Sequence, residues 1–150
     1  AHETTCLSNL KQIYAAAQLY KADYSKFPSR TIANEEWTPC LSRSIVVGCP
    51  VSLEPMAYRQ DMGDYRTMFN VDPKDADYAR CKEVRQGDWP VVMDRNHERA
   101  AVGRVTGRRA VLLIRENGSA VVVNGNRMAE FRNHPESFPC PFLYDFYVNL

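Results

Sequence analysis

The feature that most constrains the fold is a pair of apolar runs in RRAVLLIRENGSAVVVNGNR, residues 108–127. Asn117-Gly118 joins the two runs, and this pair suits a type I′ turn because both residues tolerate positive φ. The segment therefore predicts a β-hairpin whose second strand ends at Asn124-Gly125. Both runs are almost continuously apolar, so we expect both faces of the sheet to be covered.

The first part of the chain predicts an amphipathic helix over about residues 2–26, packed on one face of that sheet. Its apolar residues recur at steps of three and four and form one stripe: Cys6, Leu10, Ile13, Ala17, Tyr20 and Tyr24. Pro28 ends the helix. The stripe begins in the first turn without a capping box, which is typical of a helix cut from a longer one. An ordinary N-terminal helix capped by Thr4 or Thr5 is the alternative.

The middle of the chain predicts a loop region over about residues 27–70, in which SIVVGCP and YRTMFNV are the strand candidates. Asp72 as N-cap and Pro73 at the first helical position predict a short helix to about Cys81. WPVVMDR predicts a strand, and the last residues of the C-terminal tail are expected to add an edge strand. The fold class is therefore α+β, with a long N-terminal helix on an antiparallel sheet formed mainly by residues 88–150.

Composition bounds the size and the partners of this fold. A chain of 150 residues with 45% hydrophobic content is sufficient for one domain, residues 1–150, with a proper core. A net charge of +1 gives no bulk field that would attract nucleic acid or an anionic membrane. The chain as given has no apolar run of the roughly 18 residues that a membrane span needs, and no signal peptide.

The cysteine content favours an oxidising compartment. None of the five cysteines forms a CxxC pair or a zinc pattern with histidines, so disulfides are the favoured interpretation. The sequence leaves the pairing open, although Cys40 and Cys49 are near enough to close a short loop that ties the middle region. Five reduced, buried thiols in a cytosolic protein are the alternative. The disulfide candidates are Cys6, Cys40, Cys49, Cys81 and Cys140.

The segment CLSNLKQIYAAAQLYKADYSKFPS, residues 6–29, resembles the sequence that follows the membrane segment in type IV pilin-like proteins and type II secretion pseudopilins. It is most similar to the prepilin-type processing-associated group, through the Cys-Leu-Ser-Asn-Leu-Lys-Gln stretch at 6–12 and the Phe27-Pro28 exit. Cys49-Pro50 and His97, followed by VLLIRENGSAVVV, also fit that group. Asn117 stands where the group usually has aspartate.

The resemblance implies a pilin-like fold and a non-enzymatic filament subunit of a type II secretion or type IV pilus-like system. It also implies a short basic leader, a membrane-spanning helical half and a glutamate near the mature N-terminus, all before Ala1. The expected location is the periplasmic or extracellular face, anchored in the bacterial inner membrane or in a surface filament. The expected partners are other subunits, the inner membrane and secreted cargo.

Two other classes of function are weighed beside this one. The first is a stand-alone secreted binding module. The second is a small cysteine hydrolase, in which His97, oriented by Asp94, would activate Cys49 or Cys81 as the nucleophile. No glycine-rich elbow or oxyanion-hole signature frames either cysteine, so we expect no enzymatic activity and no catalytic residues.

No cofactor and no metal is expected, with calcium as the alternative. Major pseudopilins carry a calcium site in a late loop, and DPKDAD and RQDMGD gather acidic residues here. Neither stretch matches the 12-residue EF-hand loop, so a helix start or a solvated turn is favoured.

Two further clusters are interpreted as structural. A local basic cluster lacks interleaved aromatic residues, so a solvated or ion-paired surface is favoured over nucleic-acid binding. The cluster consists of Arg95, Arg99, Arg104, Arg108 and Arg109. Aromatic residues also gather near the C-terminus, and the hydrophobic core is favoured over a partner or glycan surface for them. They are Phe138, Phe142, Tyr144, Phe146 and Tyr147.

Overall fold

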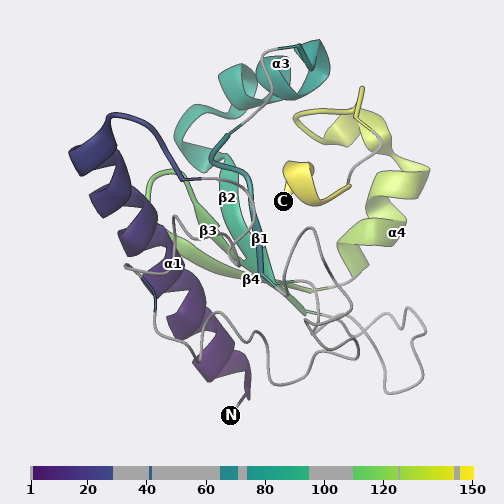
Figure 1. Cartoon of the computed structure of the whole chain (residues 1–150). Coiled ribbons are helices and arrows are strands. Elements are labelled where there is room, and N and C mark those ends of the chain that lie inside the picture. Colours follow the sequence, from purple (N-terminus) through teal and green to yellow (C-terminus); the bar gives the residue numbers. More distant parts are fainter. Residues whose placement is uncertain are drawn as a thin grey trace, which may run out of the picture.

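A computed structural model describes residues 2–28, 41, 65–70, 74–94, 110–124, 126–143 and 146–150. Within them a long N-terminal helix, α1 (His2–Tyr24), lies across one face of an antiparallel sheet (Figure 1). The predicted α+β class, with the N-terminal helix on the sheet, is thus confirmed. None of the described helices is both long enough and apolar enough to cross a membrane.

The sheet is a four-stranded meander in the order β1-β2-β3-β4. Its strands are β1 (Tyr65–Thr67), β2 (Pro90–Asp94), β3 (Ala110–Arg115) and β4 (Ala120–Asn124). The register sets Arg66 opposite Met93, Met93 opposite Leu113, and Leu113 opposite Val121. The strands predicted in YRTMFNV and WPVVMDR and in both halves of the hairpin are therefore confirmed.

The burial of the hairpin differs between its two strands. Val111 to Ile114 of β3 are all buried, as expected for a strand covered on both faces. In β4, which pairs with β3 alone among the described strands, Val122 is 44% exposed. The expectation that both runs are covered is therefore wrong for β4, because α1 packs mainly on β2 and β3 and leaves this face of β4 open.

The turn of the hairpin also differs from the predicted type. Gly118 has φ +86°, but Asn117 is not among the non-glycine residues with positive φ, so the turn is not type I′. Gly118 N donates to Arg115 O at 2.8 Å and Arg115 N to Ser119 O at 2.9 Å, a type I turn followed by a glycine bulge. The Asn117 side chain accepts from Ser119 N at 3.0 Å, and this local bond holds Asn117 in the ordinary region.

The buried stripe of α1 agrees with the sequence pattern except at its last member. Cys6, Leu10, Ile13 and Ala17 are fully buried, and Tyr20 is nearly so. Tyr24, by contrast, is 63% exposed. It belongs to the last turn of α1, and its ring lies on Tyr20 with the centroids 4.5 Å apart. Periodicity alone cannot show that the stripe ends one turn before the helix does.

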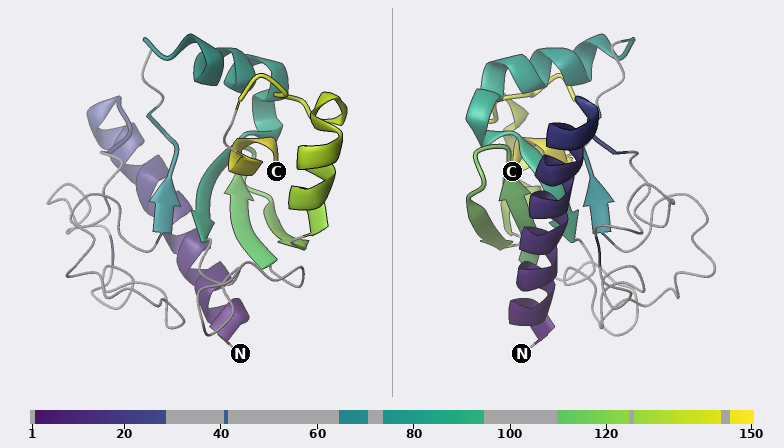
Figure 2. Two further views of the ribbon diagram at one scale, coloured as in Figure 1. Left: turned by 90° about the vertical axis from the view of Figure 1, so that its right-hand side faces the viewer. Right: turned by 60° about the vertical axis from the view of Figure 1, so that its left-hand side comes forward.

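The face of the sheet opposite α1 is covered by the C-terminal part of the chain (Figure 2). This layer contains α4 (Asn126–Asn133) and the 3₁₀ turns η4 (Pro135–Ser137) and η5 (Phe146–Asn149). The helix α3 (Ala76–Arg85), followed by η2 (Gln86–Asp88), lies across one end of the molecule. The sequence did not predict α4, and the expected C-terminal edge strand is wrong, because η5 occupies those residues.

The predicted short helix exists, but its limits are later than expected. Asp75 caps α3, with its carboxylate accepting from Tyr78 N at 3.3 Å, and the helix continues to Arg85. The sequence placed the cap at Asp72 and the end at about Cys81. Asp75 is also a preferred N-cap residue. In the helix that follows it, Tyr78 and Cys81 are three residues apart and therefore lie on the same face.

One disulfide is present in the described part of the chain, between Cys81 and Cys140, with the Cα atoms 5.5 Å apart. It links α3 to the segment after η4. Cys6, the third described candidate, is fully buried and is not bonded to either of these two cysteines. The predicted loop closure by Cys40 and Cys49 lies outside the described residues.

Candidate functional site

The residues of the hydrolase hypothesis do not form a catalytic group where the structure describes them. Cys81 is bonded to Cys140 and is not available as a nucleophile. Asp94 is fully buried at the end of β2. His97 and Cys49 lie outside the described residues, as does the whole basic cluster from Arg95 to Arg109. Phe138 is buried, as favoured for the C-terminal aromatics, and Phe142 is half-buried.

A buried polar cluster lies between α1 and the sheet. Asn9 Nδ2 donates to the Tyr65 hydroxyl at 2.8 Å, and that hydroxyl donates to Cys6 Sγ at 3.8 Å. Burial raises the pKa of Tyr65 above its usual range. The hydrogen bond from Asn9 opposes this shift, and the nearby Cys6 and Asp94 add to it. The tyrosine therefore stays protonated and fixes the position of α1 on β1.

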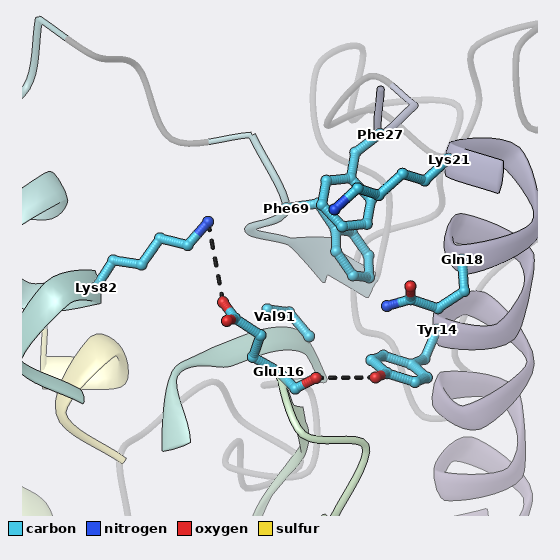
Figure 3. A pocket seen from close by; sticks show the side chains of 8 residues that line it. All are labelled: Tyr14, Gln18, Lys21, Phe27, Phe69, Lys82, Val91 and Glu116. Carbon is cyan, nitrogen blue, oxygen red and sulfur yellow. Dashed lines mark hydrogen bonds and ion pairs between the residues drawn. The ribbon is translucent and has the colours of Figure 1, made fainter. Parts of the chain in front are cut away.

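A pocket of about 170 Å³ opens between α1 and the turn that joins β3 to β4 (Figure 3). Its floor is aromatic: Phe27 stacks on Phe69 with the ring centroids 4.9 Å apart, and the ammonium of Lys21 lies 4.4 Å from the Phe27 centroid. The pocket is lined by Tyr14, Gln18, Lys21, Phe27, Phe69, Lys82, Val91 and Glu116.

The polar groups of this pocket bind one another across three elements. The Tyr14 hydroxyl donates to Glu116 O at 2.8 Å, which ties α1 to the β3–β4 turn. Lys82 of α3 lies 3.9 Å from the Glu116 carboxylate, as Figure 3 shows. The lining contains neither cysteine nor histidine, so it lacks an activated nucleophile of the kind that the hydrolase hypothesis needs. The pocket therefore joins the helix, the turn and α3.

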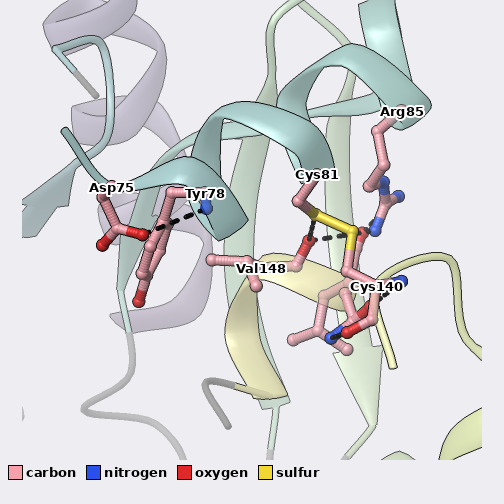
Figure 4. The surroundings of a disulfide bond; sticks show 8 residues. Asp75, Tyr78, Cys81, Arg85, Cys140 and Val148 are labelled. Carbon is pink, nitrogen blue, oxygen red and sulfur yellow. Dashed lines mark hydrogen bonds between the residues drawn. A yellow bond between two sulfur atoms is a disulfide. The ribbon is translucent and has the colours of Figure 1, made fainter. Parts of the chain in front are cut away.

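The disulfide lies within a hydrogen-bonded C-terminal block (Figure 4). Arg85 donates to Val148 O at 3.3 Å and to Leu150 O at 3.0 Å. The Asn149 side chain accepts from Cys140 N at 2.7 Å and donates to Cys140 O at 3.2 Å. These bonds satisfy buried backbone groups of a segment that has no sheet partner. They explain why the tail forms a fixed turn although it is not a strand.

A second pocket, of about 380 Å³, lies beside this block and was not anticipated from the sequence. Arg85, Arg115 and Arg127 line it, each from a different element. The three arginines are distant in the sequence, and no motif connects them. Only the topology of the sheet and the disulfide bring them together.

The acidic residues considered for calcium have other roles where they are described. Asp75 caps α3, which agrees with the helix start favoured from the sequence. Within the described ranges, no group of three or more histidine, cysteine, aspartate or glutamate side chains is arranged to hold a metal ion. Asp61, Asp64 and Asp72 lie outside those ranges.

Comparisons of the chain with protein-family models, with curated proteins and with solved structures gave no match.

Proposed function

We propose that this domain is the head of a pilin-like filament subunit, with a structural and not a catalytic role. The observation that carries the proposal is the placement of α1. It lies along one face of a four-stranded antiparallel meander, and its N-terminal end is at the edge of the described fold in all three views (Figures 1 and 2). An apolar helical segment preceding Ala1 would extend α1 away from the sheet without a clash with the described elements.

The outward face of α1 supports contact with further copies of the chain. Five exposed residues recur along it at steps of four and three, and none of them is charged: Ser8, Gln12, Ala15, Leu19 and Ala22. Leu19 is 66% exposed. The small side chains of Ser8, Ala15 and Ala22 let a second helix approach closely, and the absence of charge keeps the desolvation cost of such a contact low.

The disulfide supports the proposed location. Cys81–Cys140 closes a large part of the chain, and such bonds persist in the periplasm or outside the cell. A stand-alone secreted module would share this property, so the test must detect assembly and not only export.

The test is site-specific photo-crosslinking in native cells that produce the chain with all its native upstream residues. A photoreactive residue at Leu19 is expected to give a ladder of self-crosslinked multimers. The matched control carries the same substitution in the 1–150 domain alone, exported to the same compartment, and it should stay monomeric. Monomers from both proteins would contradict the proposal, and identical ladders would show association through the head and not through an upstream helix.

A further inference from the structure

Three guanidinium groups converge on the larger pocket from three elements. Arg85 is the last residue of α3, Arg115 the last of β3, and Arg127 lies in the first turn of α4. Figure 4 shows Arg85 at the end of α3, beside the C-terminal block. The other lining residues are Val122, Val123, Pro139, Asn149 and Leu150. No carboxylate side chain is among these described lining residues.

The positive charges at this pocket are only partly compensated. Arg85 donates its hydrogen bonds to main-chain oxygens, those of Val148 and Leu150. Burial lowers the pKa of Arg85, and the positive charges of Arg115 and Arg127 lower it further. The negative charge of Asp88 acts in the opposite direction. Mutual repulsion of this kind makes an added anion favourable.

Arg115 provides the second independent observation. Its Nε atom is buried and has no hydrogen-bond partner among the described residues. A buried donor without an acceptor is rare in folded proteins and calls for an explanation such as an ion. Arg127 pairs with Glu130 at 3.6 Å, but both side chains are at least half exposed, so this pair is weak and readily exchanged.

The walls of the pocket are apolar. Val123, Pro139 and Leu150 stand beside the guanidinium groups, and Pro139 is exposed. The side chain of Val122 projects to the other face of β4. A purely inorganic anion would leave this apolar surface in water. A ligand with an oxyanion at one end and a short aliphatic body would cover it.

We propose that Arg115 and Arg127, beside Arg85, form a binding site for a small organic oxyanion, with the aliphatic body of the ligand against Val123 and Pro139. Guanidinium groups suit carboxylate and phosphate oxygens because their planar forks donate in pairs. Arg85 has a structural role, because it holds the C-terminal block through its hydrogen bonds. That role does not account for the presence of Arg115 and Arg127 at the pocket. The site does not depend on the filament proposal.

The test is an NMR titration of the 1–150 protein with hexanoate, acetate and inorganic phosphate, at an ionic strength of about 20 mM to limit screening. Hexanoate is expected to saturate with shifts at Val123 and Arg127, and to bind about tenfold more tightly than acetate because of its longer chain. Equal affinities for hexanoate and acetate would overturn the apolar part of the site. Saturation by phosphate alone would restrict it to inorganic oxyanions and overturn the organic ligand.

Two variants and one control separate the site from general surface charge. Arg127→Gln and Arg115→Gln should each weaken hexanoate binding about tenfold. Arg132→Gln, on the same helix as Arg127 but outside the pocket, should change it less than twofold. Arg127 is half exposed, so its variant tests the site even if Arg115→Gln does not fold. An equal loss in Arg132→Gln and Arg127→Gln, or no saturable binding to the unmodified protein, would overturn the proposal.

Discussion

At the scale of single residues, the end of α1 carries a testable backbone conformation. Ser25 has φ +59°, and its N–H donates to Lys21 O at 2.8 Å. Glycine is the usual residue at this position after a helix, because a side chain strains the left-handed region. Ser25→Gly should therefore raise the free energy of unfolding by about 0.5–1 kcal/mol. Urea denaturation measures this change.

The matched control is Ala15→Gly, an exposed position within α1. Glycine in a helix interior costs about 1 kcal/mol relative to alanine, so the same new residue should have the opposite effect there. Destabilisation by both substitutions would contradict the assigned end of α1.

Tyr65 gives a prediction about pH. Its raised folded-state pKa, caused first by burial, means that the folded protein keeps a proton that an unfolded tyrosine releases above about pH 10. The stability from Tyr65 is therefore complete below pH 10 and is lost as the pH rises further. Tyr65→Phe should lower stability at pH 8 by about 1 kcal/mol, because Asn9 loses its acceptor.

Above pH 10 the wild type should lose stability more steeply than Tyr65→Phe, by about 1.4 kcal/mol per pH unit. Urea unfolding of both proteins at pH 8, 10 and 11 measures the difference. Tyr24→Phe is the control, because Tyr24 is exposed and lies outside the buried cluster. Parallel curves for the wild type and Tyr65→Phe would show that Tyr65 is not held in a buried site.

At the scale of elements, the Cys81–Cys140 disulfide joins residues 59 apart in the sequence. A cross-link of this span restricts the unfolded chain, and its loss is expected to cost about 4 kcal/mol. The double variant Cys81→Ser/Cys140→Ser should show this loss in urea denaturation, and Cys6→Ala should not, because Cys6 is not part of this cross-link. A non-reduced peptide map that pairs either cysteine with another partner would contradict the described link.

The elements predicted from the sequence are those with a local signal. The apolar periodicity of α1 and the apolar runs beside Asn117 were sufficient to predict a helix and a hairpin. In contrast, α4 has only eight residues, and Phe131 within it is positioned by a T-shaped contact with Phe138 at 5.2 Å. A helix this short depends on tertiary contacts, which the local sequence does not reveal.

The strand predicted for the C-terminal tail is wrong for a similar reason. Its aromatic and β-branched residues favour a strand, but Arg85 and Asn149 bind its backbone in a turn. These partners come from a distant helix and from the tail itself. Strand propensity is overridden because the backbone groups are already satisfied.

At the scale of the whole molecule, the candidate sites arise from topology. The buried cluster of Asn9 and Tyr65 and the pocket of Arg85, Arg115 and Arg127 each combine residues from separate elements. Composition and residue spacing do not predict such long-range contacts. The candidates that the sequence motifs offer, His97 and the Arg95–Arg109 cluster, lie outside the described residues.

The central claim is that this domain is the head of a filament subunit whose first helix continues before Ala1. The most direct measurement is the N-terminal sequence of the mature protein isolated from its native cells, compared with its gene. The account predicts about 20 apolar residues that continue α1, preceded in the gene by a short basic leader. A mature chain that begins near Ala1 after a cleaved signal peptide would contradict it.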